Sequence, residues 1–519
     1  MSLLRDTTLS QAIRGLGGRQ WLLFPDEEPT FEFQPAKRRS SSSLASKDVS
    51  AAKDSNFAAL VDWYGPNDPE NPRNWSARRK IWVTALVTIY SFIVYCGSSI
   101  IVPSYQFLMA RYNVSGEVVS LALAVYIIGY GMGPMLFSPL SEIAVIGRNP
   151  PYVVSFTVFV VVSIILAVVD SFPAILVLRF LQGFFGSPCL ASGGASIQDI
   201  FSWSTAPYGF VFWVGGFYCG PALGPLLAGY AVSTNWRWPL WEMVIMSAPF
   251  LIVLLAFLPE TSHETLLLRR AQRLRRRTGN LALRALSETK TLDFHAILVD
   301  ALVKPTEIAI KDPAIAFVCV YSSFVYAIYY SFFEAFPITY GETYAMSLPS
   351  VCLIFLCIIV GCVGAGLLYC GYLYHVFFPR ATRQPPTQES RLIPALPAVC
   401  FLPAGLFLYA WTARASIHWL VPTLGVTVYA GASFVVFQAI ICYVPLSYPR
   451  YVASLFAAND FTRSMAAAGF VMFSRAMYVN LGIDRGVTVL AGLSIMGILG
   501  MFFLYVYGQK LRARSKFAG

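Results

Sequence analysis

Charged residues are scarce in this sequence. Asp, Glu, Lys and Arg account for 13% of its 519 residues, whereas about a quarter is usual in soluble domains. Four long ranges, 81–110, 200–236, 343–379 and 415–449, contain none of these residues. Each range is long enough to span a membrane, because about 20 apolar residues are enough to cross a bilayer. The composition therefore excludes an ordinary soluble protein and predicts an integral membrane protein.

Metal-binding side chains are also scarce. The four histidines are scattered, and no two of the ten cysteines have the CxxC spacing of a zinc site. All ten cysteines lie within apolar stretches, so we expect them to pack as small apolar residues without a disulfide framework. The sequence also lacks the GxxxxGK(S/T) phosphate-binding loop. We therefore expect no metal site, no cofactor and no nucleotide-driven step.

Long apolar segments recur from Ile81 onward, each bounded by charges, prolines or glycines. Only helices or closed barrels satisfy the backbone polar groups in lipid, and these segments are too continuously apolar for barrel strands. The sequence therefore predicts an all-α integral membrane protein with twelve transmembrane helices. The segments are centred near residues 92, 128, 161, 186, 219, 250, 324, 363, 402, 430, 464 and 496.

A polar stretch divides these segments into two equal sets. Residues 261–312 contain RRAQRLRRRTGN and separate six spans from six, as in an internally duplicated transporter. The predicted pseudo-symmetric six-helix bundles are residues 67–260 and 313–508, joined by the loop 261–312. Residues 1–66 have the composition of a disordered tail, and residues 509–519 form a second tail. Within the first tail, a kinase site at Ser40–Ser43 and a solvated linker are both possible interpretations.

The distribution of basic residues predicts the orientation. The formal net charge is +11, but the basic residues flank apolar segments and form no continuous face for nucleic acid. In the odd-numbered loops only Arg111, Arg237, Arg414 and Arg485 occur, whereas the termini, central loop and even-numbered loops hold many more. The positive-inside rule then places both termini and the central loop in the cytoplasm.

Few ionisable residues lie inside the predicted spans. Each costs about 2.5–3.5 kcal/mol on insertion scales, so each is a candidate for function. Tyr326, Tyr330 and Glu334 recur every four residues and share one helix face. A buried carboxylate beside tyrosine rings suits a cationic or aromatic ligand and exchange of a proton. A structural carboxyl hydrogen-bonded to a neighbouring helix is an equally weighted alternative.

Two further spans contain polar pairs. Asp460 and Arg463 are one helical turn apart, which favours a structural ion pair over a direct part in proton coupling. Arg179 and Gln182 also share a face. The arginine could lower the pKa of a nearby carboxylate, or its side chain could snorkel to the interface.

The fifth predicted span has a stripe of small residues. Gly216, Gly220 and Gly224 recur every fourth residue, with Pro221 and Pro225 on the adjoining face. Small residues at this spacing allow helices to approach closely. Prolines one turn apart free backbone carbonyls and kink the helix, which suits a span that moves between two access states.

Several motifs together resemble the major facilitator superfamily, and within it the fungal twelve-span drug:proton antiporters. The loop GPMLFSPLSEIAVIGRNPPYV is similar to the superfamily's conformational latch, with Gly133, Glu142, Gly147 and Arg148 at matching positions. RFLQGFFGSP resembles the fourth-span proton-coupling motif, and GGFYCGPALGPLLAGY resembles the fifth-span antiporter motif. The resemblance covers about residues 67–508 and implies two bundles that rock about one central site.

The function expected from these features is proton-coupled export of amphipathic organic compounds, such as drugs, toxins or secondary metabolites, by alternating access. Tyr326, Tyr330 and Glu334 would line the substrate cavity, and Arg179, Gln182, Glu334, Asp460 and Arg463 are the proton-coupling candidates. We expect a monomer in the plasma membrane, with the vacuolar membrane as an alternative. A nutrient or sugar importer of the same fold is the alternative function. A receptor or an enzyme fits less well, because an enzyme would need clustered catalytic groups at one interface.

Overall fold

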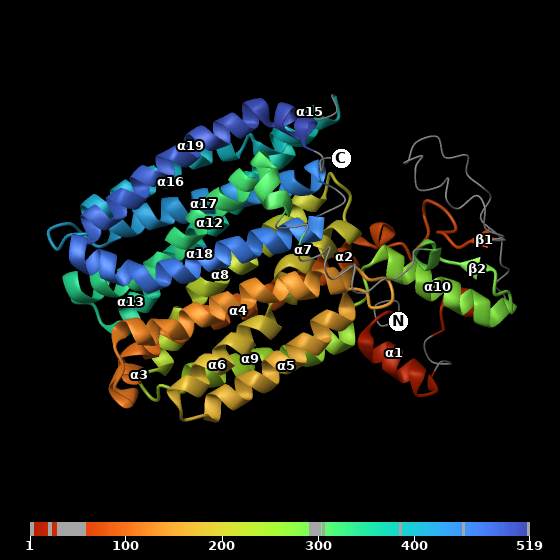
Figure 1. Ribbon diagram of the computed structural model, residues 1–519, viewed down its shortest axis with the longest axis horizontal. Helices are drawn as coiled ribbons and strands as arrows, with labels where there is room; N and C mark the ends of the chain where they lie inside the picture. Colours follow the sequence, from red (N-terminus) through yellow and green to blue (C-terminus); the bar gives the residue numbers. More distant parts are fainter. Residues whose placement is uncertain are drawn as a thin grey trace.

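The computed structural model describes residues 5–18, 23–28, 59–289, 303, 307–383, 387–448 and 452–515. Long helices run side by side along its longest axis, and a smaller group of elements projects from one end (Figure 1). Among the described residues the only strands are β1 (Ala59–Leu60) and β2 (Leu283–Arg284), which pair in parallel. The structure is therefore a helical bundle with a small appended module.

The first half contains six long helical segments, of which the fourth is divided in two. Its elements are α2 (Ala77–Ser99), η5 (Val102–Ser104), α3 (Tyr105–Tyr112), α4 (Gly116–Glu142), α5 (Asn149–Val168), α6 (Phe172–Gly186), α7 (Pro188–Ile200), α8 (Ala206–Ala231) and α9 (Trp238–Phe257).

The second half repeats this pattern with more irregular turns. Its elements are α12 (Pro313–Phe336), η7 (Pro337–Thr343), α13 (Leu348–Ile354), α14 (Leu356–Tyr372), η8 (Leu373–Phe377), α15 (Phe378–Ala381), η9 (Gln388–Leu392), α16 (Ala395–Thr412), α17 (Leu420–Ser447), α18 (Val452–Leu481) and α19 (Ile483–Arg514).

The predicted all-α membrane fold is confirmed. Eleven helical segments among the described residues are long and apolar enough to cross a membrane. The twelfth long helix, α18, has 30 residues but carries Asp460, Arg463 and Arg475, which reduce its apolar character. It packs against α4 and α12, within the bundle. Asp460 and Arg463 are thus buried inside the bundle, whereas the Arg475 side chain is 39% exposed.

The two halves pack their helices in the same order. In each half the first helix packs against the fifth (α2 with α8, α12 with α18) and the second against the fourth (α4 with α6, α14 with α17). The third also packs against the sixth (α5 with α9, α16 with α19). The main contacts between halves join α4 to α18 and α8 to α14. This arrangement is that of a parallel internal repeat.

The glycine stripe of α8 packs directly on the backbone of α2. A Cβ at Gly220 would lie 2.9 Å from the carbonyl oxygen of Phe92, and one at Gly216 would lie 2.9 Å from that of Thr88. At Gly224 it would lie 2.8 Å from the carbonyl oxygen of Cys96. The three glycines therefore permit close approach of the two helices, as the spacing predicts.

The prolines of α8 leave a carbonyl that α2 satisfies. Pro225 has no N–H, so the carbonyl oxygen of Pro221 lacks its usual partner one turn later. The hydroxyl of Ser99 donates to that oxygen at 2.6 Å. The hydrogen bond compensates for the proline inside the membrane, where no water is available.

We expect Gly220→Ala to lower the thermal stability of the purified protein, because the added methyl group meets backbone atoms of α2. Gly215→Ala is the matched control, since a Cβ at Gly215 has no atom within 4 Å. Alanine in an exposed helix position gains about 1 kcal/mol over glycine, so the control should be neutral or stabilising. Equal melting temperatures for the two variants, measured by a thermal shift assay, would contradict tight packing of α2 on α8.

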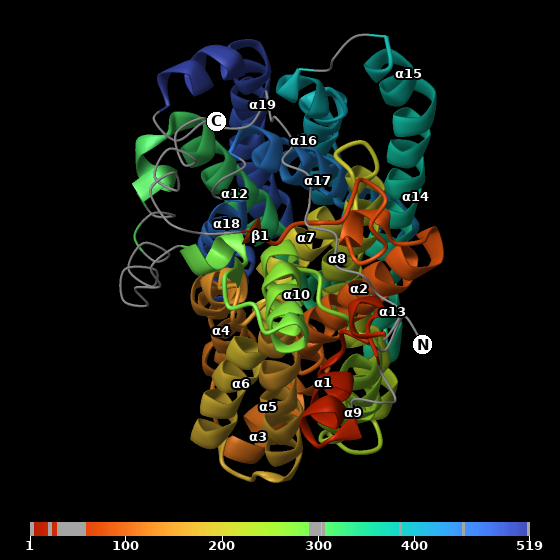
Figure 2. The same cartoon turned by 90° about the vertical axis from the view of Figure 1, so that its right-hand side faces the viewer.

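The projecting module lies at the end of the bundle that also carries the chain termini, which we call the α10 end (Figures 1 and 2). Among the N-terminal segments, η2 contacts α10, whereas α1 contacts α5 and α9. The module comprises α1 (Thr8–Gly15), η2 (Pro25–Glu27), β1, η4 (Pro72–Asn74), α10 (His263–Thr278), β2 and η6 (Leu286–Thr289).

Buried ion pairs attach the N-terminal segments to α10. Arg270 Nη1 lies 2.7 Å from Asp68 Oδ2, and Arg273 Nε lies 2.9 Å from Asp26 Oδ2. Glu70 lies 2.9 Å from both guanidinium groups. Burial alone would raise the pKa of Asp68, but hydrogen bonds from Arg270 and from backbone N–H groups outweigh it and hold that pKa below its usual value.

This packing differs from the disordered tail predicted for residues 1–66. Residues 5–18, 23–28 and 59–66 are placed against the bundle and α10. Composition did not reveal this, because Asp26 of the tail pairs with Arg273, which lies 247 positions away. The possible kinase site at Ser40–Ser43 lies outside the described residues.

Candidate functional site

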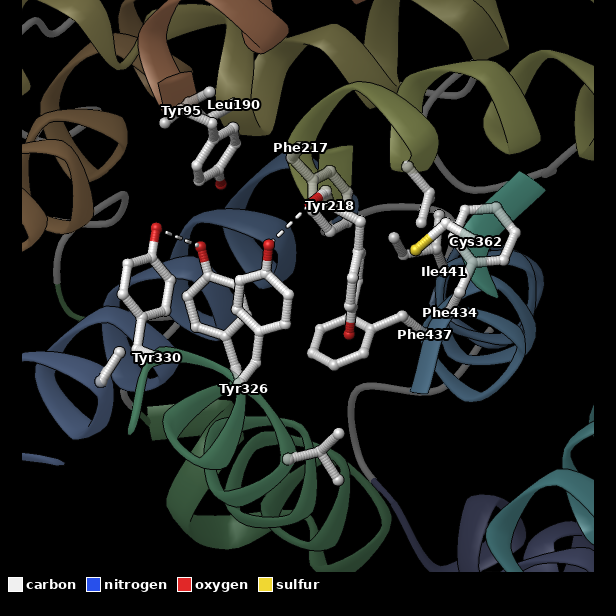
Figure 3. Close-up of a cluster of buried hydrophobic side chains, with 14 of the residues drawn as sticks. Tyr95, Leu190, Phe217, Tyr218, Tyr326, Tyr330, Cys362, Phe434, Phe437 and Ile441 are labelled. Carbon is white, nitrogen blue, oxygen red and sulfur yellow. Dashed lines mark hydrogen bonds between the residues drawn. The ribbon is translucent and has the colours of Figure 1, made fainter. Parts of the chain in front are cut away.

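Tyrosine hydroxyls from both halves meet at the centre of the bundle. Tyr326 and Tyr330 of α12 lie side by side and face the first half (Figure 3). The Tyr130 hydroxyl of α4 lies 3.1 Å from each of their hydroxyls. Ser98 of α2 lies 3.2 Å from the Tyr330 hydroxyl. These four side chains are fully buried, so each of these hydrogen bonds links the halves out of contact with water.

An ion pair on α18 adjoins these hydroxyls. Arg463 donates from Nε and Nη2 to Asp460 Oδ1, at 2.9 and 2.5 Å, and from Nη2 to the Tyr95 hydroxyl of α2 at 2.7 Å. Its guanidinium carbon lies 4.9 Å from the ring centres of Phe217 and Tyr326. The second carboxylate oxygen, Asp460 Oδ2, is buried without a hydrogen-bond partner. The pair is therefore joined internally, yet one acceptor is unused.

We call the residues at this site the central cluster. It contains three side chains of the first half that hydrogen-bond to four of the second half. Its members are Tyr95, Ser98, Tyr130, Tyr326, Tyr330, Asp460 and Arg463.

Glu334 lies on the same face of α12, farther from the α10 end. Its Oε1 accepts a hydrogen bond from Ser120 of α4 at 3.0 Å, and its Oε2 lies 3.8 Å from Arg475 Nη1 of α18. The carboxylate is thus shared between the two halves, and it does not contact the hydroxyls of Tyr326 and Tyr330. Our sequence reasoning missed Arg475, although a basic residue within the eleventh apolar segment was a signal for it.

Arg179 is fully buried and binds backbone carbonyls. It donates to the carbonyl oxygens of Gly97 at 2.6 Å, Ser98 at 2.5 Å and Ala122 at 3.0 Å, and to Gln182 Oε1 at 3.2 Å. Gly97 and Ser98 belong to the last turn of α2, where carbonyls lack intrahelical partners and a cation is favoured. The arginine therefore caps α2, instead of snorkelling or pairing with a carboxylate of the described residues.

The latch motif forms an ion pair at the α10 end. Arg148 Nε lies 2.5 Å from Asp199 Oδ2 of α7. Gly147 adopts φ +79°, a left-handed conformation that favours glycine. Glu142 ends α4 with an exposed side chain. The arginine of the motif pairs with Asp199 and not with this glutamate. No spacing within the motif points to this partner, which lies 51 positions away. At the other end of the motif, Gly133 packs against Phe184 of α6.

Glu260 connects the latch motif to α10. Its side chain is fully buried and accepts from the backbone N–H groups of Arg148 at 3.0 Å and Asn149 at 3.3 Å. It also accepts from those of Thr261 and Ser262, each at 2.9 Å. A single carboxylate thus caps the start of α5 and the segment that leads into α10.

Replacing Glu260 with glutamine should destabilise the α10 end. The amide presents one oxygen to four N–H donors, and each buried donor left unsatisfied costs about 1–3 kcal/mol. We therefore expect a lower melting temperature for Glu260→Gln. Glu264→Gln removes an exposed carboxylate from the first turn of α10 and is the control. A change no larger than that of the control would show that Glu260 is not a cap.

A pocket lies between the halves at the α10 end. Its volume is about 180 Å³, and Arg391 of η9 lines it. Arg391 Nη2 donates to the carbonyl oxygen of Trp203 at 3.0 Å, and Gln438 Nε2 donates to that of Pro207 at 2.9 Å. These two bonds join the halves beside the pocket. Other lining residues are Arg73, Gln198, Phe201, Ala206, Phe210, Cys442, Pro445 and Leu446.

The duplicated fold and the buried polar site between its halves agree with one family model. The model described as the Major Facilitator Superfamily matches residues 87–470, more than half of the chain. The chain belongs to the Major Facilitator Superfamily. The resemblance noted in the motifs is thereby confirmed.

Relatives within this superfamily cover nearly the whole chain. The chain is 45% identical over 467 residues to the MFS-type transporter pyvG of Aspergillus violaceofuscus, covering 89% of this chain and 86% of the relative. It is 37% identical over 501 residues to fluconazole resistance protein 1 of Saccharomyces cerevisiae, covering 94% and 91%. The solved structure of the human organic anion transporter MFSD10 matches this chain with a TM-score of 0.59 at 16% identity. The match covers 82% of this chain and 99% of that chain, and it shows that the two proteins share a fold.

Proposed function

We propose that this major facilitator protein exports amphipathic organic compounds in exchange for protons. The observation that carries the proposal is the central cluster, in which buried polar side chains of one half bind those of the other. Such a site near mid-membrane is where transporters of this architecture hold substrate and coupling ions. The name of the fluconazole resistance relative supports an exporter of foreign organic compounds.

The contacts between halves support alternating access. Away from the α10 end, Glu334 with Ser120 and Arg475 bridges the halves. At the α10 end, the pocket beside Arg391 separates part of the first half from the second half. Rocking of one half against the other would break one set of contacts and form the other. The pair of Arg148 and Asp199 lies within the first half and, in this scheme, fixes the latch motif at the α10 end.

Two carboxylates are suited to carry the proton. Glu334 and Asp460 lie within spans, where an uncharged carboxyl is easier to accommodate than a carboxylate. Asp460 has one free oxygen, and Glu334 accepts a hydrogen bond from the Ser120 hydroxyl and lies 3.8 Å from Arg475 Nη1. Gln182 positions Arg179 by accepting a hydrogen bond from its guanidinium group. The α8 motif supplies a close but kinked helix contact with α2; its residues are Gly216, Gly220, Pro221, Gly224 and Pro225. Arg463 then positions Asp460, and Arg179 positions the end of α2 that carries Ser98.

We place the α10 end in the cytoplasm, because most arginines and lysines of the loops and tails lie there. With this orientation the pocket beside Arg391 opens to the cytoplasm, as expected for the entry side of an exporter. Residence in the plasma membrane as a monomer completes the proposal.

Retention of a panel of fluorescent and toxic amphiphiles tests the proposed function. The panel is loaded into pump-depleted yeast that express the chain, with and without a protonophore. Lower retention that the protonophore abolishes is the expected result. Raised retention would instead indicate an importer of the same fold, and unchanged retention with the protein at the cell surface would contradict broad export.

A further inference from the structure

The charges around the central cluster are unequal. Arg463 is paired with Asp460, whereas Arg179 binds backbone carbonyls and Gln182. Arg179 holds Ser98, a member of the cluster, through its carbonyl oxygen. Glu334, one turn beyond Tyr330, is engaged by Ser120 and lies near Arg475. At and around the cluster, three guanidinium groups thus stand against two carboxylates, and Arg179 is the one without a carboxylate partner among these residues.

The protonation state of Asp460 does not reverse this balance. When Asp460 is ionised, its pair with Arg463 is neutral. When Asp460 carries a proton, the pair has a charge of +1. In neither state does the cluster offer an uncompensated anion, and burying a cation without a counter-charge is costly. A cationic ligand is therefore disfavoured throughout a transport cycle.

The aromatic faces of the site already hold a cation. The guanidinium carbon of Arg463 lies 4.9 Å from the ring centres of Phe217 and Tyr326 and 5.8 Å from that of Phe437. Cations bind the faces of such rings. Arg463 therefore occupies the positions on these faces that a ligand cation would need.

Separation of the halves leaves hydroxyls without partners. The bonds of Tyr130 to Tyr326 and Tyr330, of Ser98 to Tyr330, and of Arg463 to Tyr95 all cross between the halves. Buried polar groups require replacement partners. A compound with neutral oxygen or nitrogen atoms could supply them while its rings pack against the tyrosines.

We propose that the central cluster selects uncharged aromatic compounds with hydrogen-bonding oxygen or nitrogen atoms and discriminates against cations, with Arg463 as the specificity-determining residue. The selection rests on the proposed export function, because it assumes that the cluster contacts the transported compound. It narrows the cationic or aromatic ligand expected from the sequence to the uncharged aromatic class.

A pair of isosteric substrates tests the selection. One fluorescent aromatic scaffold carries a 3,3-dimethylbutyl group, and its twin carries a trimethylammonioethyl group, which has the same shape and a fixed positive charge. Efflux of each is measured from yeast expressing the full chain, and binding of each is measured with the purified protein. The neutral compound should be exported faster and bound more tightly, by about tenfold or more.

Charge variants at α18 identify the responsible residue. Arg463→Gln leaves Asp460 uncompensated and should reduce the preference for the neutral compound to within about threefold. Asp460→Asn with Arg463→Gln removes both charges and should restore part of the preference. If the single variant does not fold because Asp460 is left unpaired, the double variant, which has no unpaired charge at this position, still tests the role of Arg463. Surface fluorescence of a tagged chain and the melting temperature confirm that each variant is folded.

The outcomes separate the selection from the export function. Equal export and binding of the two compounds by the unmodified protein would overturn the selection and leave export intact. An unchanged preference in a folded Arg463→Gln variant would overturn the role of Arg463. Export of neither compound by protein at the cell surface would contradict the export function, and the selection with it.

Discussion

Glu334→Gln should abolish the accumulation that a proton gradient drives while leaving substrate exchange in place. Glutamine can still accept the hydrogen bond from Ser120, so the contact between halves is preserved. It cannot bind and release a proton near neutral pH, however. Each proton exchanged across one pH unit supplies about 1.4 kcal/mol, or a tenfold concentration ratio. The variant should lose that ratio completely.

Proteoliposomes containing the purified chain provide the measurement. An imposed pH gradient should concentrate a fluorescent substrate with the unmodified protein and fail to do so with Glu334→Gln. Counterflow without a gradient should continue in both. Glu117→Gln, on the first turn of the same helix as Ser120 and exposed, is the matched control. Full gradient-driven accumulation by Glu334→Gln would assign the coupling to another group, of which Asp460 is the next candidate.

The bundle could be predicted from sequence because it depends on composition and periodicity. Apolar segments of membrane length, a polar divider and the distribution of basic residues reflect the bilayer itself. The four-residue spacing of Tyr326, Tyr330 and Glu334 correctly predicted a shared helix face, because spacing within one helix fixes direction. The glycine spacing in α8 indicated close packing for the same reason.

Contacts between distant segments could not be predicted in this way. Nothing in the spacing of RFLQGFFGSP shows that Arg179 reaches the carbonyls of α2, since its partners lie 57 to 82 positions away. The partner of Arg148 is Asp199 of α7, and the cap formed by Glu260 joins the start of α5 to the segment that leads into α10. The packing of the described N-terminal segments depends on Arg270 and Arg273 in the same way. Predicting each of these contacts requires knowledge of the three-dimensional arrangement of the helices.

Arg179→Ala should destabilise the whole protein, because the arginine donates to three buried backbone carbonyls of α2 and α4. Removing one partner from a buried charged network typically costs about 3–5 kcal/mol, and here three backbone oxygens lose a donor inside the membrane. Arg179→Lys keeps the charge, but an ammonium on a flexible stem does not reproduce the planar fork that spans these oxygens. Both variants should have lower melting temperatures and lower surface levels, with the lysine variant less affected.

The comparison with Arg111→Ala isolates the role of the buried cap. Arg111 forms an exposed ion pair with Asp170 at the end of the bundle away from α10, and solvent screens such a pair, so its loss should change the melting temperature little. If Arg179→Ala melts like the unmodified protein yet loses proton-driven accumulation, the arginine acts in coupling and the cap is dispensable. If stability and accumulation fall together, and a second substitution that stabilises the protein elsewhere restores both, the arginine serves to hold the end of α2. We expect the second result, because every hydrogen bond of the guanidinium is to the backbone or to Gln182.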